Sequence, residues 1–129
     1  MSTKISIKSD TLTRRLYAQD ASMYEEMPKG VIFPESGEDI AFLVRQAAKE
    51  KWSITARSAG TSLAGQATGS GLIMDVSKNM NKILELNVKD SWVKVQPGVI
   101  RDQLNREVAL NNLIFGPDTS TTSHCMIGV

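Results

Sequence analysis

The spacing of apolar residues predicts a strand and an amphipathic helix in the first part of the chain. An apolar, β-branched run at residues 31–33 (VIF) is typical of a buried strand. Ser36 follows, with Asp39 three positions later, which is the pattern of a capping box at the start of a helix. Apolar residues then recur from Ile40 at the spacing of one helical face. The run ends in the basic stretch at residues 49–51, where positive charge suits the helix dipole.

Two further apolar runs follow this helix. Residues 53–56 (SITA) and 71–76 (GLIMDV) predict a second and a third strand, and residues 11–18 (TLTRRLYA) predict a short helix before the first strand. The order strand, helix, strand, loop, strand is typical of an α/β fold. Its strands are expected to pair in parallel across the helix.

The pattern changes in the second half of the chain. Residues 82–88 and 91–97 alternate apolar and polar side chains and predict an antiparallel hairpin. Residues 99–112 carry one apolar stripe at helical spacing and predict a helix, and residues 113–115 (LIF) predict another short strand. The polar run at residues 116–124 (GPDTSTTSH) predicts a loop. The expected fold class is therefore α/β, with an α+β second part.

Composition excludes several classes of function. The chain has 129 residues, of which 41% are hydrophobic, and its net charge is +1, so we expect one globular domain without the basic surface of a nucleic-acid-binding protein. No apolar stretch approaches the roughly 18 residues of a membrane span. The lone Cys125 can form neither an internal disulfide nor, with the single histidine, a structural zinc site. We therefore expect a cytoplasmic protein.

The stretch most suggestive of chemistry is residues 57–71, RSAGTSLAGQATGSG. A flexible linker is one interpretation, but the stretch lies between two strands that should be neighbours, and it directly follows a strand, where α/β proteins bind ligands. Small residues let backbone N–H groups converge on phosphate oxygens, and glycine permits the positive φ that such an anion site requires. Ser58, Thr61 and Ser62 add hydroxyl donors.

The loop matches neither of two common phosphate-binding motifs. Gly60 and Gly65 have the spacing of the nucleoside-triphosphate P-loop, but Gln66 and Ala67 stand where that motif has lysine and serine or threonine. The dinucleotide fingerprint also fails, because a strand rather than a helix follows the loop. The sequence predicts a pyrophosphate site built from backbone donors. A non-enzymatic module that binds another phosphate ligand or a partner protein remains the alternative.

Several segments in order resemble the FAD-linked oxidase superfamily, which includes vanillyl-alcohol oxidase, p-cresol methylhydroxylase (PCMH) and the D-2-hydroxyacid dehydrogenases. The segments are VIFPESGEDIAFLVRQAAKE, RSAGTSLAGQATGSGLIMDVSKNMNKILELN, WVKVQPGVIRDQLN and GPDTSTTSHCMIG. Within the superfamily, the sequence of these segments is most similar to that of large bacterial D-lactate/glycolate-type dehydrogenases, some of which carry an iron–sulfur domain.

This resemblance implies a domain organisation and an activity. Residues 1–76 would form the first, FAD-binding subdomain of a PCMH-type domain and residues 77–129 an incomplete second α+β subdomain, with the substrate domain absent. The complete enzyme would oxidise a small D-2-hydroxy acid by hydride transfer to N5 of FAD, and the chain alone would be inactive. An iron–sulfur cluster would belong to the parent protein and not to this chain, and an electron acceptor could bring the parent to a membrane surface. Exposed apolar surface also predicts self-association of the chain.

The resemblance also implies the residues that contact FAD, in two loops. In the first, Arg57 would lie at the rim of the pyrophosphate site, and Thr61 stands where some relatives have a histidine bonded covalently to the flavin. Non-covalent FAD is therefore implied. The remaining residues of the first loop are Ser58, Ala59, Gly60, Ser62, Gly65 and Gln66. Those of the second loop are Pro117, Asp118, Ser120, Thr121, His124 and Gly128. No catalytic residue and no metal ligand is expected in the chain.

Overall fold

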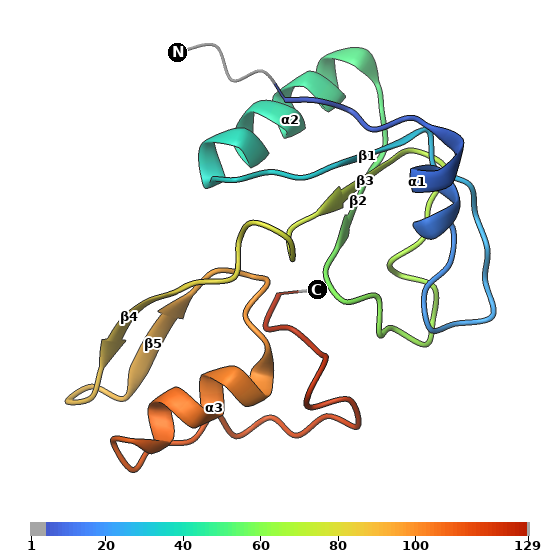
Figure 1. Ribbon diagram of the computed structural model, residues 1–129. Coiled ribbons are helices and arrows are strands. Elements are labelled where there is room, and N and C mark those ends of the chain that lie inside the picture. Colours follow the sequence, from blue (N-terminus) through green and yellow to red (C-terminus); the bar gives the residue numbers. More distant parts are fainter. Residues whose placement is uncertain (1–4, 129) are drawn as a thin grey trace.

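The computed structural model describes residues 5–128, so Val129 and the first four residues lie outside it. The described part contains, in chain order, α1 (Thr11–Leu16), β1 (Gly30–Ile32), α2 (Gly37–Glu50), β2 (Ile54–Arg57), β3 (Leu72–Asp75), β4 (Ile83–Asn87), β5 (Trp92–Val95) and α3 (Arg101–Ala109). The mixed helix and strand content confirms the expected fold class. Figure 1 shows the elements in two groups, with the C-terminal residues between them.

The first group is a parallel sheet with strand order β1-β3-β2. Val31 and Thr55 both align with Ile73 of the central strand, so the expected parallel pairing is confirmed. Every residue of β1 and β3 is buried, which explains their continuous apolar runs. Helix α2 lies over one face of this sheet (Figure 1) and contributes Leu43 to its core.

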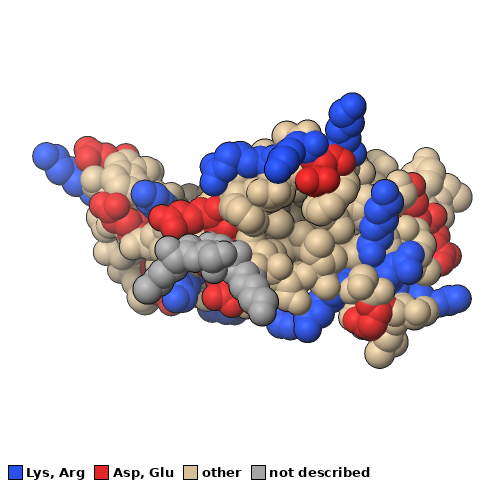
Figure 2. Space-filling view, turned by 90° about the horizontal axis from the view of Figure 1, so that it is seen from above, with Lys and Arg blue, Asp and Glu red and all other residues tan. Residues whose placement is uncertain are grey.

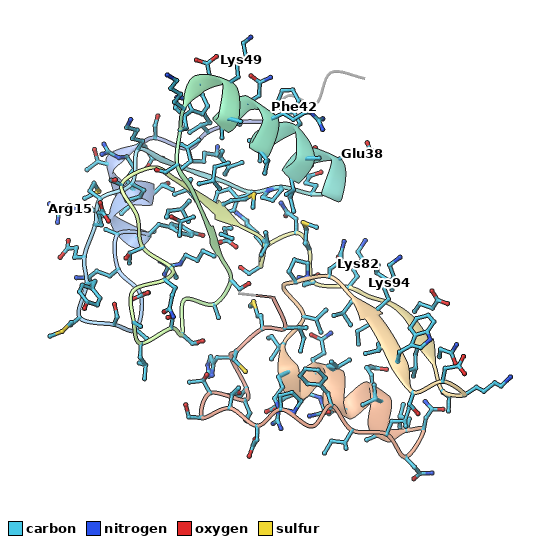
Figure 3. The ribbon with its side chains drawn as sticks, turned by 180° about the vertical axis from the view of Figure 1, so that it is seen from behind. Arg15, Glu38, Phe42, Lys49, Lys82 and Lys94 are labelled. Atoms are coloured by element: carbon cyan, nitrogen blue, oxygen red, sulfur yellow. The ribbon has the colours of Figure 1, made fainter. Side chains whose placement is uncertain are left out.

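Helix α2 begins and ends as its sequence predicts. The Ser36 side chain accepts a hydrogen bond from the Asp39 backbone N–H, and the Asp39 side chain accepts one from the Ser36 N–H, which completes a capping box. Lys51 ends the helix in the left-handed conformation, with φ of 56°. Figure 3 shows Glu38 and Lys49 near opposite ends of the helix, where each charge suits the helix dipole.

The second group is the antiparallel hairpin of β4 and β5, with α3 packed against it. Leu86 aligns with Val93 in the hairpin, and both pack on the buried residues Leu104 and Val108 of α3. Lys82 and Lys94 point away from α3 (Figure 3), as expected for strands with one apolar and one polar face.

Two expectations about the second group are wrong. Helix α3 ends at Ala109, and Asn112, with φ of 57°, lies in the turn beyond it. Residues 113–115 do not form a strand. The side chain of Asn105 instead accepts a hydrogen bond from Phe115 N (2.8 Å) and donates one to Phe115 O (3.3 Å). A helix side chain thus satisfies backbone groups that a neighbouring strand would otherwise have paired.

The described residues carry their charges in mixed order. On the face shown in Figure 2, basic and acidic side chains are interspersed, which agrees with the net charge of +1. Among residues 5–128, no helix has both the length and the apolar character needed to cross a membrane. Over the same residues, no group of three or more His, Cys, Asp and Glu side chains is placed to hold a metal ion.

Candidate functional site

The glycine-rich loop begins where β2 ends, at the carboxyl edge of the parallel sheet. Arg57, the last residue of β2, aligns with Asp75 of β3, and Ser58 opens the loop. Gly60 and Gly65 have φ of 69° and 77°. The positive φ predicted from the sequence is therefore confirmed at these two glycines, and the loop can take turns that other residues rarely adopt.

The loop presents backbone donors that no protein group within the described residues uses. Within residues 5–128, the N–H groups of residues 58–63 donate no hydrogen bond to the protein. The hydroxyl of Ser62 donates to Oε1 of Gln66, which ties two parts of the loop together. The loop lines a pocket of about 340 Å³. Its lining residues are Ser58, Gly60, Thr61, Ser62, Gln66 and Ala67.

This arrangement suits an anion more than a cation. No lysine or arginine occurs between Arg57 and Lys78, so the attraction would come from unpaired N–H dipoles and hydroxyl groups. The pocket volume is at the lower end of the range of about 300–1,000 Å³ for ligand sites. A pocket of this size and lining fits the pyrophosphate part of a larger ligand.

Residues 19–21, which the sequence did not indicate as part of the site, form hydrogen bonds with the loop. Ala21 N donates to Gly60 O at 2.9 Å, and Ala67 N donates to Oδ2 of Asp20 at 3.3 Å. The Arg57 guanidinium donates through Nη1 to Gln19 O at 2.7 Å. Residues 19–21 lie between the helix expected at residues 11–18 and the strand expected at residues 31–33, and their composition indicated no such contact.

The carboxylate of Asp20 is held in its charged form. Partial burial acts in the opposite direction, but hydrogen bonds from Ser22 and Ala67 outweigh it and keep the pKa of Asp20 below its ordinary value. Asp20 therefore remains a hydrogen-bond acceptor for the loop at neutral pH.

Tyr17 joins the same segment to the sheet. Its hydroxyl donates to Oδ2 of Asp75 at 2.5 Å, and Oδ1 of Asp75 accepts from the backbone and hydroxyl of Ser77. Burial, and after it the hydrogen bond to Asp75, raises the pKa of Tyr17 well above its ordinary value. Asp75 thus caps the turn at Ser77 and also accepts the hydrogen bond from Tyr17.

The two predicted loops meet at one point. The Ser58 hydroxyl donates to the carbonyl of Gly128, so residues far apart in sequence become neighbours. Gly128 N donates to Pro97 O at 2.9 Å, and Ile127 N donates to Val99 O at 2.9 Å. The C-terminal segment therefore lies between the sheet and the hairpin (Figure 1).

Arg101 contacts two of the other residues predicted in the second loop. Its Nε donates to Pro117 O at 2.9 Å, and its Nη2 forms an ion pair with Asp118 at 3.1 Å. Thr121 O accepts from the backbone of His124, and the His124 ring contacts the Ser123 hydroxyl. Over residues 5–128, no hydrogen bond joins Pro117, Asp118, Ser120, Thr121 or His124 to the glycine-rich loop.

Two larger hollows lie outside residues 57–67 of the loop, although Ser70 and Gly71 line the first of them. One of about 440 Å³ lies at the amino ends of the strands, beside Lys51, Trp52 and Leu72. The other, of about 810 Å³, lies beside Glu38 and Asp39 at the start of α2. Neither is lined by residues 57–67, so the glycine-rich loop remains the candidate site.

Comparison with known proteins identifies the family. A family profile described as "FAD binding domain" matches residues 28–128, which is most of the chain. The chain belongs to this FAD binding domain family. FAD is thus the cofactor class, and the unpaired donors and positive-φ glycines of the loop fit its pyrophosphate.

Individual relatives agree with this assignment. The chain is 40% identical over 118 residues to the D-2-hydroxyglutarate dehydrogenase of Escherichia coli K12, covering 89% of this chain and 12% of that protein. It is 34% identical to the glycolate oxidase subunit GlcD of Bacillus subtilis 168, covering 89% of this chain and 25% of that subunit. The chain thus spans about an eighth of the first relative and a quarter of the second.

A solved structure supports the fold. The crystal structure of p-cresol methylhydroxylase with substrate bound superposes with a TM-score of 0.76 at 20% identity. The match covers 92% of this chain and 24% of that one. The resemblance to PCMH-type domains seen in the sequence is therefore confirmed for the fold of this FAD binding domain.

Proposed function

We propose that the chain is the FAD-binding portion of a flavoprotein that oxidises a D-2-hydroxy acid of the lactate or glycolate type. Its similarity to a D-2-hydroxyglutarate dehydrogenase and a glycolate oxidase subunit supports the oxidoreductase class and the substrate class. The chain spans a small part of each relative, so the groups that bind and activate the hydroxy acid would lie in the rest of the protein.

The observation that carries the proposal is the row of unpaired backbone donors in the loop after β2. Ser58, Ala59, Gly60, Thr61 and Ser62 would offer their N–H groups to the FAD pyrophosphate. When bound, FAD supplies the hydride acceptor at N5, since the redox chemistry belongs to the cofactor. The part of this chain is to bind and orient it. Thr61 lines the pocket with a hydroxyl that forms no covalent link to a flavin, so FAD would be held non-covalently.

The second loop would lie along the remaining length of the cofactor. The contact of Ser58 with Gly128 supports this, because it brings the end of the second loop beside the first loop. Arg101, through Pro117 and Asp118, would hold the outer part of the loop in shape. Ser120, Thr121 and His124 are exposed and would be available to the ribityl chain and flavin ring.

The proposal includes the surroundings of the chain. Residues 1–76 and 77–129 would be two subdomains with FAD between them, and each has a separate cluster of buried residues. Electrons would leave through an iron–sulfur centre or another carrier elsewhere in the parent protein. A cytoplasmic location, with peripheral membrane contact through that acceptor, is part of the same proposal.

A titration with FAD tests the site. Binding to the chain should change flavin fluorescence and raise the unfolding temperature. Gly60→Ala should weaken binding about tenfold, because a side chain at positive φ costs about 1–2 kcal/mol. The new Cβ would also lie 2.7 Å from Nη2 of Arg57.

Gly37→Ala is the matched control for this titration. Gly37 opens α2, and nothing lies within 4 Å of the position of its added Cβ. We expect FAD affinity equal to that of the unaltered chain. If FAD changes neither fluorescence nor unfolding temperature, this chain does not bind FAD by itself. If Gly60→Ala binds as tightly as Gly37→Ala, the loop is not the binding site.

A further inference from the structure

We propose that Arg57 and Asp20 are positioning residues, which hold the glycine-rich loop in its binding shape from behind and do not contact the phosphates. The inference rests on the proposed function, because the loop is taken to bind FAD. It assigns Arg57 a role different from the one that the sequence pattern implied, at the rim of the site.

Within residues 5–128, the hydrogen bonds of the Arg57 side chain all go to backbone carbonyls of the protein. Nη1 donates to Gln19 O at 2.7 Å and makes longer contacts of 3.4 Å with Tyr17 O and Ala67 O. The guanidinium carbon lies 5.2 Å from the centre of the Tyr17 ring. Ala67 lies ten positions after Arg57 in the same loop, so one guanidinium connects two parts of the loop to the N-terminal segment.

Gly60 shows how closely the loop backbone packs on this guanidinium. A Cβ at Gly60 would lie 2.7 Å from Nη2 and 3.0 Å from Cζ of Arg57. The carbonyl of Gly60 accepts a hydrogen bond from Ala21, on the same side. Gly60 thus turns its carbonyl and Cα toward Ala21 and Arg57, and the N–H groups around it have no partner in the part of the chain that the structure describes.

The contacts of Asp20 indicate that it supports the loop and does not act on the ligand through its charge. A carboxylate this near a pyrophosphate site would repel the ligand if charge alone mattered. Asp20 instead accepts hydrogen bonds from Ala67 N at 3.3 Å and Ser22 N at 2.8 Å. Arg57 and Asp20 carry opposite charges, so together they add no net charge to the site. Their shared feature is a contact with the backbone of Ala67.

The first experiment compares Arg57→Lys with the unaltered chain. A lysine keeps the positive charge and binds phosphate as a point charge, but it lacks the planar fork that reaches several carbonyls. Hydrogen exchange without FAD should be about tenfold faster at the amides of Ala21, Ala67 and Thr68, which are bonded within this support. FAD affinity should fall about three- to tenfold, as expected for lost hydrogen bonds.

Arg45→Lys is the matched control, because Arg45 is exposed on α2, away from the loop. It should change neither exchange nor affinity. Unchanged exchange in Arg57→Lys would overturn the proposal, and so would faster exchange with full FAD affinity. If the unaltered chain binds no FAD, the exchange rates alone decide whether the support exists, and only the proposed function fails.

The second experiment asks whether substitutions of Asp20 weaken or strengthen FAD binding. Asp20→Asn removes the charge and keeps one oxygen, which can still accept from Ala67 N–H at the expense of the bond from Ser22 N–H, whereas Asp20→Ala removes the charge and both acceptors. A supporting role predicts near-normal FAD affinity for Asp20→Asn and about three- to tenfold weaker binding for Asp20→Ala. If both variants bind FAD more tightly than the unaltered chain, Asp20 acts through its charge and the proposal is wrong.

Discussion

At the scale of single residues, the Tyr17–Asp75 pair should make the free energy of unfolding depend on pH in the alkaline range. Folding raises the pKa of Tyr17, so the neutral phenol is favoured in the folded protein. Its contribution is complete below the unfolded pKa of about 10 and is lost as the pH rises above that value. Tyr17→Phe should cost about 1–2 kcal/mol at pH 7, since the buried Asp75 loses a donor. The difference between the two proteins should shrink above about pH 10.

Urea unfolding between neutral and strongly alkaline pH measures this difference. Tyr24→Phe is the matched control, because Tyr24 is 57% exposed and its hydroxyl has no hydrogen-bond partner within residues 5–128. It should follow the unaltered chain at every pH. A gap between Tyr17→Phe and the unaltered chain that stays constant across alkaline pH would show that Tyr17 does not titrate differently on folding.

Some features of the loop residues could be predicted from the sequence and others could not. Positive φ at Gly60 and Gly65 could be predicted, because glycine tolerates it and the loop composition left few alternatives. The contacts of the Arg57 side chain could not be predicted from the sequence. Its main partner, Gln19, lies 38 positions away, and no periodic pattern connects the two. The contacts of Arg101 with the second loop were missed for the same reason.

At the scale of elements, the capping box of α2 is a measurable part of the stability. Ser36→Ala removes the acceptor for Asp39 N–H and should destabilise the protein by about 1 kcal/mol. The midpoint of chemical unfolding measures the loss. Glu38→Gln is a suitable control in the same turn, and it should cost less, because only a dipole interaction of about 0.3–1 kcal/mol weakens. Equal losses in the two variants would mean that the cap bond adds nothing beyond charge.

Elements were predictable where local signals agree. Helix α2 has a cap, one apolar face and a basic end, and its start was found to the residue. The hairpin followed from alternation alone. The strand predicted at residues 113–115 is absent. An apolar run of three residues predicts a strand, but it does not show whether a neighbouring strand is there to pair with it. In the structure Asn105 supplies those partners, and Phe115 still packs on the second core.

At the scale of the whole molecule, the two core clusters are joined by a close backbone contact. Gly98 N donates to Met80 O at 2.7 Å. A Cβ at Gly98 would lie within 2.9 Å of Val76 O and 2.8 Å of Ser77 Cα. The proposed boundary after residue 76 therefore falls where the chain crosses itself tightly. The family resemblance implied a boundary there, but the contact depends on Gly98, which no periodic pattern of the sequence singles out.

The apolar surface of the second group should make the chain associate with itself. Trp92 and Ile114 line the same hollow of about 120 Å³, and they are 42% and 77% exposed. Burying such side chains gains about 1.5–3 kcal/mol each, enough for weak association when two copies meet on this surface. Replacing both residues with glutamine should weaken the association at least about tenfold.

Light scattering over a range of protein concentrations measures this association. The control is Leu12→Gln with Leu16→Gln, which alters two exposed leucines of α1 at 70% and 68% exposure. It should leave the association unchanged if the surface around Trp92 and Ile114 is the contact. A monomer at all concentrations would contradict the prediction outright. Equal weakening in both double variants would show that association is general rather than specific to this surface, because exposed apolar side chains on either group would then contribute alike.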